Sequence, residues 1–256
     1  MPTGKQTKRK RKRRPAARPA EPGLGFSVDS QPDDVTCGPV CLHGVYRYYG
    51  DAASLESVMT DLKMLEAGGT LDVFLANHAL RRGYKATLYT YNLQLFDPSW
   101  FELSNENLRA RLEAQAAAKR GRERLQIATR GYVEFLRLGG KVRLRDLQPT
   151  LLRELLNKGA PVITGLSATF LYRSVREVPE TNKDDDVRGE PVGHFVVLTG
   201  YRRMTREILI ADPMRDNPLV GSRYYAVKMH RLIGAILLGT MTYDANLLLI
   251  EPNAKQ

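Results

Sequence analysis

The chain has 256 residues, a formal net charge of +11 and a hydrophobic fraction of 43%, which fits one compact enzyme domain with a charged tail. Its two cysteines, Cys37 and Cys41, lie four residues apart and cannot form a disulfide framework, so a reducing, cytoplasmic location is expected. No apolar run is long enough for a membrane span or a signal peptide, and no transporter segment with a phosphate-binding loop is present.

Most of the net charge lies near the N-terminus. Seven consecutive basic residues, from Lys8 to Arg14, are followed by proline- and alanine-rich sequence. Such a segment cannot bury enough apolar surface to fold, so residues 1–28 are predicted to be a disordered basic tail and residues 29–256 the folded domain. The tail is expected either to contact nucleic acid or an anionic surface, or to be simply solvated.

The segment 37–50 carries the first candidate catalytic group. Apolar residues recur at helical spacing after Pro39, which fits only in a first helical turn, and Gly50 is a natural stop. Cys37 is therefore predicted at a helix start, where free N–H groups and the helix dipole favour an anion. Because a cysteine attacks only as a thiolate, this position suits a nucleophile. The alternative is a buried, unreactive cysteine.

The middle of the chain is predicted to be mainly helical. Periodicity indicates helices over 54–65 and 71–80, then a strand over 84–91. A mostly helical stretch follows over 104–138, with Gly121 and Gly131 as possible breaks. With a further helix over 147–156, it forms a predicted insertion at about 104–158, and a strand follows over 162–166.

A long polar segment follows Tyr172 and ends just before Gly193. Long loops without regular structure in compact domains are often lids or binding loops. This loop must run close to His194, the next candidate residue. Asp184, Asp185 and Asp186 are therefore predicted to contact substrate. They lack the glycine and glutamate of a calcium-binding loop.

A predicted hairpin carries the remaining catalytic candidates. The segments 193–201 and 207–211 are apolar and rich in β-branched residues, with a polar turn near Arg203. His194 and Asp212 are equidistant from that turn and are predicted to face each other, so that the carboxylate orients the imidazole. A helix over 227–238 and a strand over 245–250 are predicted to close the domain.

These residues resemble papain-like cysteine peptidases, and among them the double-glycine leader peptidases that process bacteriocins and their free-standing relatives. Gln31 stands six residues before Cys37, as the oxyanion-donating glutamine does in that family, and Gly38 follows the nucleophile. His194 opens an apolar strand. Asp212, which precedes a proline, stands at the triad position where papain itself has asparagine. The resemblance covers about residues 29–252. The long helical stretch has no counterpart in the smallest leader peptidases.

The resemblance implies an α+β papain-like fold with the nucleophile helix packed on an antiparallel sheet. It also implies a cysteine peptidase that cleaves a peptide or isopeptide bond through a Cys37 thioester, without a cofactor or metal. In this scheme Cys37, His194 and Asp212 form the catalytic triad, Gln31 stabilises the oxyanion and Gly38 lies next to the substrate.

Two other functional classes stay open at this stage. An acyltransferase or transpeptidase would use the same triad but resolve the thioester with an amine or thiol instead of water. A non-catalytic peptide-binding module would need no intact triad, and the presence of all three triad residue types argues against it.

Overall fold

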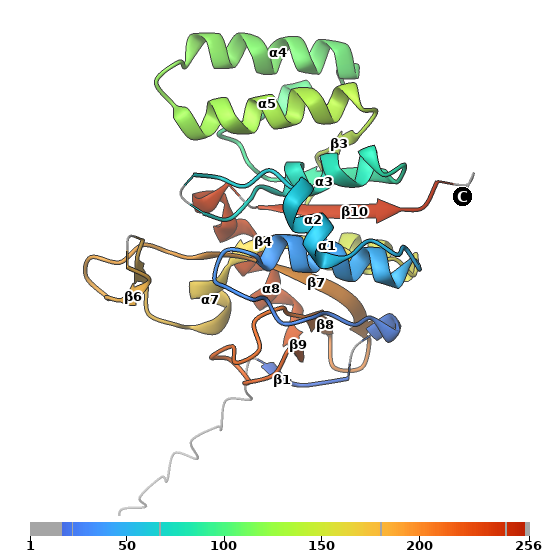
Figure 1. Cartoon of the computed structure of the whole chain (residues 1–256), viewed down its shortest axis with the longest axis vertical. Coiled ribbons are helices and arrows are strands. Elements are labelled where there is room, and N and C mark those ends of the chain that lie inside the picture. The colour runs from blue at the N-terminus through green and yellow to red at the C-terminus, as the bar shows by residue number, and fades with distance from the viewer. Residues whose placement is uncertain (1–16, 22, 67, 180, 244, 254–256) are drawn as a thin grey trace, which may run out of the picture.

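A computed structural model describes residues 17–21, 23–66, 68–179, 181–243 and 245–253. An eight-stranded sheet in the order β1-β9-β8-β7-β4-β10-β2-β3 crosses the molecule, and a two-stranded ribbon, β5-β6, lies outside it (Figure 1). Neighbouring strands of the large sheet are antiparallel except β2 and β3, which run parallel. The predicted α+β class with a largely antiparallel sheet is confirmed.

The bounds of the regular elements agree with most of the predicted segments. The strands are β1 (Ala17–Pro19), β2 (Lys85–Thr90), β3 (Lys141–Arg143), β4 (Val162–Ser167), β5 (Glu177–Val178), β6 (Lys183–Asp184), β7 (Gly193–Arg202), β8 (Glu207–Ala211), β9 (Tyr224–Lys228) and β10 (Asn246–Glu251). The helices are α1 (Cys37–Tyr48), α2 (Leu55–Asp61), α3 (Asp72–Arg81), α4 (Asn105–Ala118), α5 (Glu123–Arg137), α6 (Pro149–Asn157), α7 (Ala168–Tyr172) and α8 (Met229–Leu238). Short 3₁₀ turns are η1 (Gly23–Gly25), η2 (Pro98–Trp100) and η3 (Gly239–Thr242).

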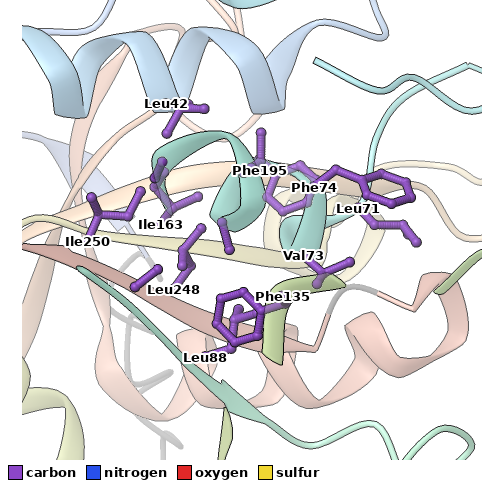
Figure 2. Packing of buried hydrophobic residues seen from close by; sticks show 14 of the residues in the cluster. Leu42, Leu71, Val73, Phe74, Leu88, Phe135, Ile163, Phe195, Leu248 and Ile250 are labelled. Carbon is purple, nitrogen blue, oxygen red and sulfur yellow. The ribbon is translucent and has the colours of Figure 1, made fainter. Parts of the chain in front are cut away.

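Helices cover both faces of the sheet. Because side chains alternate along a strand, Phe195 and Val197 of β7 enter the core beneath α1, α3 and α5, whereas Val196 and Leu198 enter the core shared with α6, α7 and α8. Figure 2 shows the first core, where side chains from α1, α3 and α5 meet those of the central strands. Two packed cores hold the central strands on both faces.

The nucleophile helix packs directly on the sheet. All of its residues from Cys37 to Tyr46 are buried, so α1 has almost no solvated face. The Cys41 thiol donates to the carbonyl oxygen of Phe195 in β7 at 3.4 Å. This contact fixes the start of α1 beside the start of β7.

The predicted hairpin is formed, but its register differs from the expected one. β7 pairs with β8 so that Val197 faces Ala211, which puts Asp212 across from Val196 and two residues away from His194. The direct opposition of His194 and Asp212 is therefore wrong. A bulge between Leu198 and Gly200 shifts the pairing by one residue. Without the bulge, the side chain of Asp212 would lie on the opposite face of the sheet from His194. The shift of one residue places both side chains on the same face.

The predicted insertion at 104–158 is helical only in part. α4 and α5 form a helix pair at the outer end of the molecule (Figure 1), joined around Gly121. Gly131 does not break α5, because it lies inside the helix where a Cβ atom would meet Val73 at 2.7 Å. β3 then joins the sheet and α6 packs in the second core. The second half of the segment is thus part of the central domain.

The end of the predicted tail also needs correction. The run from Lys8 to Arg14 lies outside the described residues, but β1 pairs with β9, and Arg18 forms an ion pair with Glu207 at 3.0 Å. Phe26 and Val28 are buried in the first core. Residues from Ala17 onward therefore belong to the folded domain, and the predicted boundary at residue 28 is wrong. The few apolar side chains of this segment are buried by pairing with distant parts of the chain, which composition does not reveal.

The N-terminal segment also contacts the bulge of β7. The Gly23 N–H donates to Thr199 Oγ1 at 3.2 Å, and a Cβ atom at Gly23 would lie 2.2 Å from the Thr199 carbonyl oxygen. This close approach requires glycine, because backbone atoms cannot move aside as a flexible side chain would.

We expect Gly23→Ala to lower the free energy of unfolding by about 1–3 kcal/mol, as overpacking does, and to lower activity by disturbing the bulge. Urea unfolding measures the first effect. Gly121→Ala is the matched control, because a Cβ atom there meets nothing within 4 Å. Equal stability of the two variants would show that the Gly23 contact does not constrain the fold.

Candidate active site

Cys37 is the first residue of α1 and lies at the wall of a groove. Its side chain is 8% exposed, and the preceding Thr36 makes no side-chain cap to the helix. The N–H groups of the first helical turn have no partner inside the helix and point outward. A groove of about 330 Å³ is lined by Cys37 together with Gly193 and Phe195, the two neighbours of His194. The thiol is therefore placed where a ligand in the groove can reach it.

His194 connects the thiol with a buried carboxylate. Its Nε2 atom donates to Asp212 Oδ1 at 2.8 Å, and both side chains are almost fully buried. Since Nε2 is engaged by Asp212, Nδ1 is the ring nitrogen left for Cys37, whose side chain interacts with the imidazole. Asp212 thus fixes the orientation of the ring, as the carboxylate does in a catalytic triad.

The electrostatics of this group favour a protonated imidazole. Burial by itself would lower the pKa of His194, but the charges of Asp212 and Cys37 and the hydrogen bonds with both outweigh burial and raise that pKa to about 10. An imidazolium beside the sulfur is the partner that a thiolate needs.

Donors other than His194 also hold the Asp212 carboxylate. Met214 N–H donates to Oδ1 at 2.9 Å, while the hydroxyl groups of Tyr172 and Tyr225 donate to Oδ2 at 2.6 and 2.8 Å. Neither tyrosine was found from the sequence. β9, which carries Tyr225, was not predicted because the helix expected from residue 227 was placed over its end, although the aromatic and β-branched run Tyr224–Lys228 favours a strand.

Cys41 has a different environment from Cys37. It is fully buried, and burial, followed by the charges of Cys37 and Asp212, raises its thiol pKa well above the ordinary value. Its role is to pack α1 against β7.

Gln31 and Gly38 lie close to these groups. The Gln31 backbone N–H donates to the carbonyl of Pro213 at 3.0 Å, next to Asp212, and its Nε2 atom donates to the Asp33 carbonyl at 2.8 Å. Gly38 is buried beneath Thr70, a groove residue, and a Cβ atom at Gly38 would meet Thr70 Cγ2 at 2.7 Å. The small size of Gly38 thus lets the groove wall approach α1.

The polar segment after Tyr172 reaches the groove, but it is not structureless as predicted. β5 and β6 form a short ribbon, and Glu177 pairs with Glu190 through their backbones. Both glutamates line the groove, and burial, with the charges of Asp184 and Asp34, raises the pKa of Glu177. The lining also includes Arg124 from the first turn of α5.

The three predicted substrate-binding aspartates are not among the residues that line the groove. Asp184 belongs to β6, and Asp185 forms an ion pair with Arg188 at 2.7 Å, which with two backbone N–H groups lowers its pKa. Arg176 donates to the backbone carbonyl of Asp186. A substrate contact by Asp184, Asp185 or Asp186 stays a prediction.

In the described ranges, no three His, Cys, Asp or Glu side chains are grouped so that they could hold a metal ion. None of the helices described is both long and apolar enough to span a membrane.

A family model described as the Peptidase_C39 like family matches residues 146–231. This match confirms the predicted resemblance to papain-like cysteine peptidases. The enzyme class predicted from the sequence, a cysteine peptidase, is confirmed with it. The matched third of the chain contains His194 and Asp212 but not Gln31 or Cys37. Among curated proteins, none matches the chain at a significant level.

Solved structures with a similar chain path are peptidases. One is a double glycine motif protease from an AMS/PCAT transporter in complex with the leader peptide, with 15% identity, coverage of 91% of this chain and 95% of that chain, and a TM-score of 0.45. A C39-like peptidase from Bacillus anthracis has 15% identity, coverage of 91% and 99%, and a TM-score of 0.46. Xylellain, a cysteine protease from Xylella fastidiosa, has 14% identity, coverage of 93% and 87%, and a TM-score of 0.46.

The two thiols are expected to differ in reactivity. Near neutral pH, iodoacetamide should label Cys37 much faster than Cys41, because only Cys37 borders the groove and faces an imidazolium, whereas Cys41 is fully buried with a raised thiol pKa. Peptide mapping by mass spectrometry after short exposures measures both rates. Equal labelling, or labelling only after unfolding, would remove Cys37 from the site.

The raised pKa of His194 gives a pH dependence. A base is protonated below its pKa, so the imidazolium persists through neutral pH and is lost near pH 10, and kcat/KM should fall there instead of near the ordinary histidine value of about 6.5. The profile is measured on a cleaved peptide. Asp212→Asn removes the charge that raises the pKa and should move this limb to lower pH. If that substitution leaves the limb of the pH profile unchanged, Asp212 does not control the pKa of His194.

Proposed function

We propose that this chain hydrolyses a peptide or isopeptide bond through a thioester on Cys37. The observation that carries the proposal is the relay from buried Asp212 through His194 to a thiol at the groove, with an imidazole pKa of about 10. This arrangement supplies a nucleophile, an acid and an orienting carboxylate in one line.

In the first half of the reaction the Cys37 thiolate attacks the carbonyl carbon of the scissile bond. The oxyanion that forms receives hydrogen bonds from the Cys37 backbone N–H and from Gln31. The Gln31 amide has two N–H bonds, and one of them donates to the Asp33 carbonyl, which holds the amide and leaves the other for the oxyanion. The position of Gln31 beside Pro213 supports this role.

Collapse of the oxyanion breaks the bond between carbon and nitrogen. His194 gives its Nδ1 proton to the leaving amine, and the acyl group remains on the Cys37 sulfur as a thioester. A water molecule then attacks the thioester while His194 accepts a proton from it, and the carboxylic acid leaves as the thiolate is restored. Asp212 keeps Nε2 engaged in both halves, so the same ring nitrogen serves as acid and base.

The substrate is a peptide or protein segment that lies in the groove beside Cys37. Gly193 and Phe195, the two neighbours of His194, border the groove, and Thr70 lies over Gly38 at the helix start. The family resemblance implies small residues, glycine above all, at the cleavage site.

Hydrolysis is tested by the products formed from a proteome-derived peptide library. We expect mass spectrometry to find cleaved peptides that end in a free carboxylate, and an acid-quenched sample to contain an acyl group on Cys37. Cys37→Ala should give neither, whereas Cys41→Ser should retain cleavage, because a hydroxyl group keeps the donor to the Phe195 carbonyl and residue 41 does not border the groove.

Addition of a glycine peptide as acceptor separates hydrolysis from acyl transfer. If amide products predominate at modest acceptor concentration, the enzyme is a transferase that uses the same residues. If no acyl group is captured while peptides are cleaved, the thioester route is wrong.

A further inference from the structure

Two tyrosines hold the oxygen of Asp212 that His194 does not contact. We propose that Tyr172 and Tyr225 are positioning residues, which hold the Asp212 carboxylate in the orientation that keeps its bond to His194 and so keeps His194 directed at Cys37. This inference rests on the proposed function and assigns a part in it to residues outside the groove.

The geometry around Asp212 satisfies the whole carboxylate. Oδ1 accepts from His194 Nε2 at 2.8 Å and from Met214 N–H at 2.9 Å, and Oδ2 accepts from Tyr172 at 2.6 Å and Tyr225 at 2.8 Å. The side chain of Asp212 is 0% exposed, so water cannot replace any of these donors. A buried carboxylate that accepts several hydrogen bonds is stabilised in its charged form.

Tyr172 reaches Asp212 from α7, in the second core. It is the last residue of α7, and its ring lies near that of His194, with centroids 6.0 Å apart. The buried Arg231 of α8 holds this helix end, since its guanidinium donates to the carbonyls of Phe170 and, at 3.0 Å, Leu171. α8 therefore fixes the position of the Tyr172 hydroxyl.

Tyr225 comes from the strand beside β8. It faces Ile210, two residues before Asp212, and the Asp212 N–H donates to the Arg223 carbonyl at 2.8 Å. The pairing of β8 with β9 thus sets the distance between the Tyr225 hydroxyl and Oδ2. The two tyrosines approach the same oxygen from different elements, α7 and β9.

Both hydroxyl groups remain donors at any physiological pH. Burial, together with the Asp212 charge, raises the pKa of both Tyr172 and Tyr225 well above the ordinary value. The other titratable groups described around Asp212 are His194 of β7 and, through their charges, Cys37 and Cys41 of α1. His194 is the one cation among these groups, and the tyrosines supply the remaining stabilisation without adding charge.

Loss of one phenol should therefore change catalysis and not only packing. Without one of the hydroxyl groups, Oδ2 is held by a single donor and the carboxylate can turn, which weakens the bond between Oδ1 and His194 Nε2. A weaker bond lowers the pKa of His194, so less imidazolium faces Cys37. The groove lining contains neither tyrosine, so peptide binding should be unaffected.

The test uses Tyr172→Phe and Tyr225→Phe, each in the full chain. We expect each substitution to lower kcat about tenfold to a hundredfold with KM unchanged, and to move the alkaline limb of the pH profile, which reports loss of the His194 proton, to lower pH. Tyr46→Phe is the matched control. Tyr46 is also fully buried, and its hydroxyl bonds to His78 at 2.7 Å, away from the site. It should lower the melting temperature without moving the alkaline limb.

Site-specific 3-fluorotyrosine at 172 or 225 tests the same hydrogen bonds without removing them. The ring and hydroxyl remain, and the more acidic phenol is a stronger donor, so the alkaline limb should move in the direction opposite to that of the phenylalanine variants. This variant decides the outcome if a phenylalanine variant does not fold. Alkaline limbs equal to that of the wild type in the phenylalanine and fluorotyrosine proteins would overturn the proposal, whatever their melting temperatures.

An NMR measurement separates this proposal from the proposed function. In the Cys37→Ala protein, the Nε2 proton of His194 should shift on each Tyr→Phe substitution, because the strength of its bond to Asp212 changes. If Cys37→Ala still cleaves peptides, the proposed function fails while this shift still reports on the tyrosines. If the shift is absent, the tyrosines do not act on His194.

Discussion

The charge of Asp212 is the constraint on which the rest of the site depends. A carboxylate with no exposure to water is unstable unless donors surround it, and here these come from β7, β9, α7 and the turn after β8. The bulge in β7 puts Asp212 on the correct face, and the Gly23 segment packs over that bulge. Packing far from the thiol is thereby linked to the orientation of His194.

The thiol and the imidazole are brought together by elements from both cores. α1 lies in the first core, whereas the tyrosines that bind Asp212 lie in the second, and β7 is shared by both. The Cys41 contact with the Phe195 carbonyl joins α1 to β7 one residue from His194. One cysteine of the helix therefore sets the position of the other.

Local signals in the sequence predicted the elements, and long-range contacts account for the differences. Pro39 and Gly50 were sufficient to place α1, and β-branched runs placed β7 and β8. The register was missed because a bulge at Thr199 has no sequence signal of its own. Tyr172 and Tyr225 were missed because hydroxyl donors are recognised only when the buried acceptor is located. Cys37 and Gln31 lie outside the matched segment, and the catalytic roles of Cys37, Gln31, His194 and Asp212 all remain predictions.

The three-residue strand β1 also protects the rim of the sheet. It covers the free backbone groups of β9, and its Pro19 has no N–H to offer to a further strand. At the opposite rim the short strand β3 presents the exposed cations Lys141 and Arg143. Cleavage within residues 17–20 would uncover β9 as a template for pairing between molecules. The cost of losing this short segment would then be aggregation as well as reduced stability.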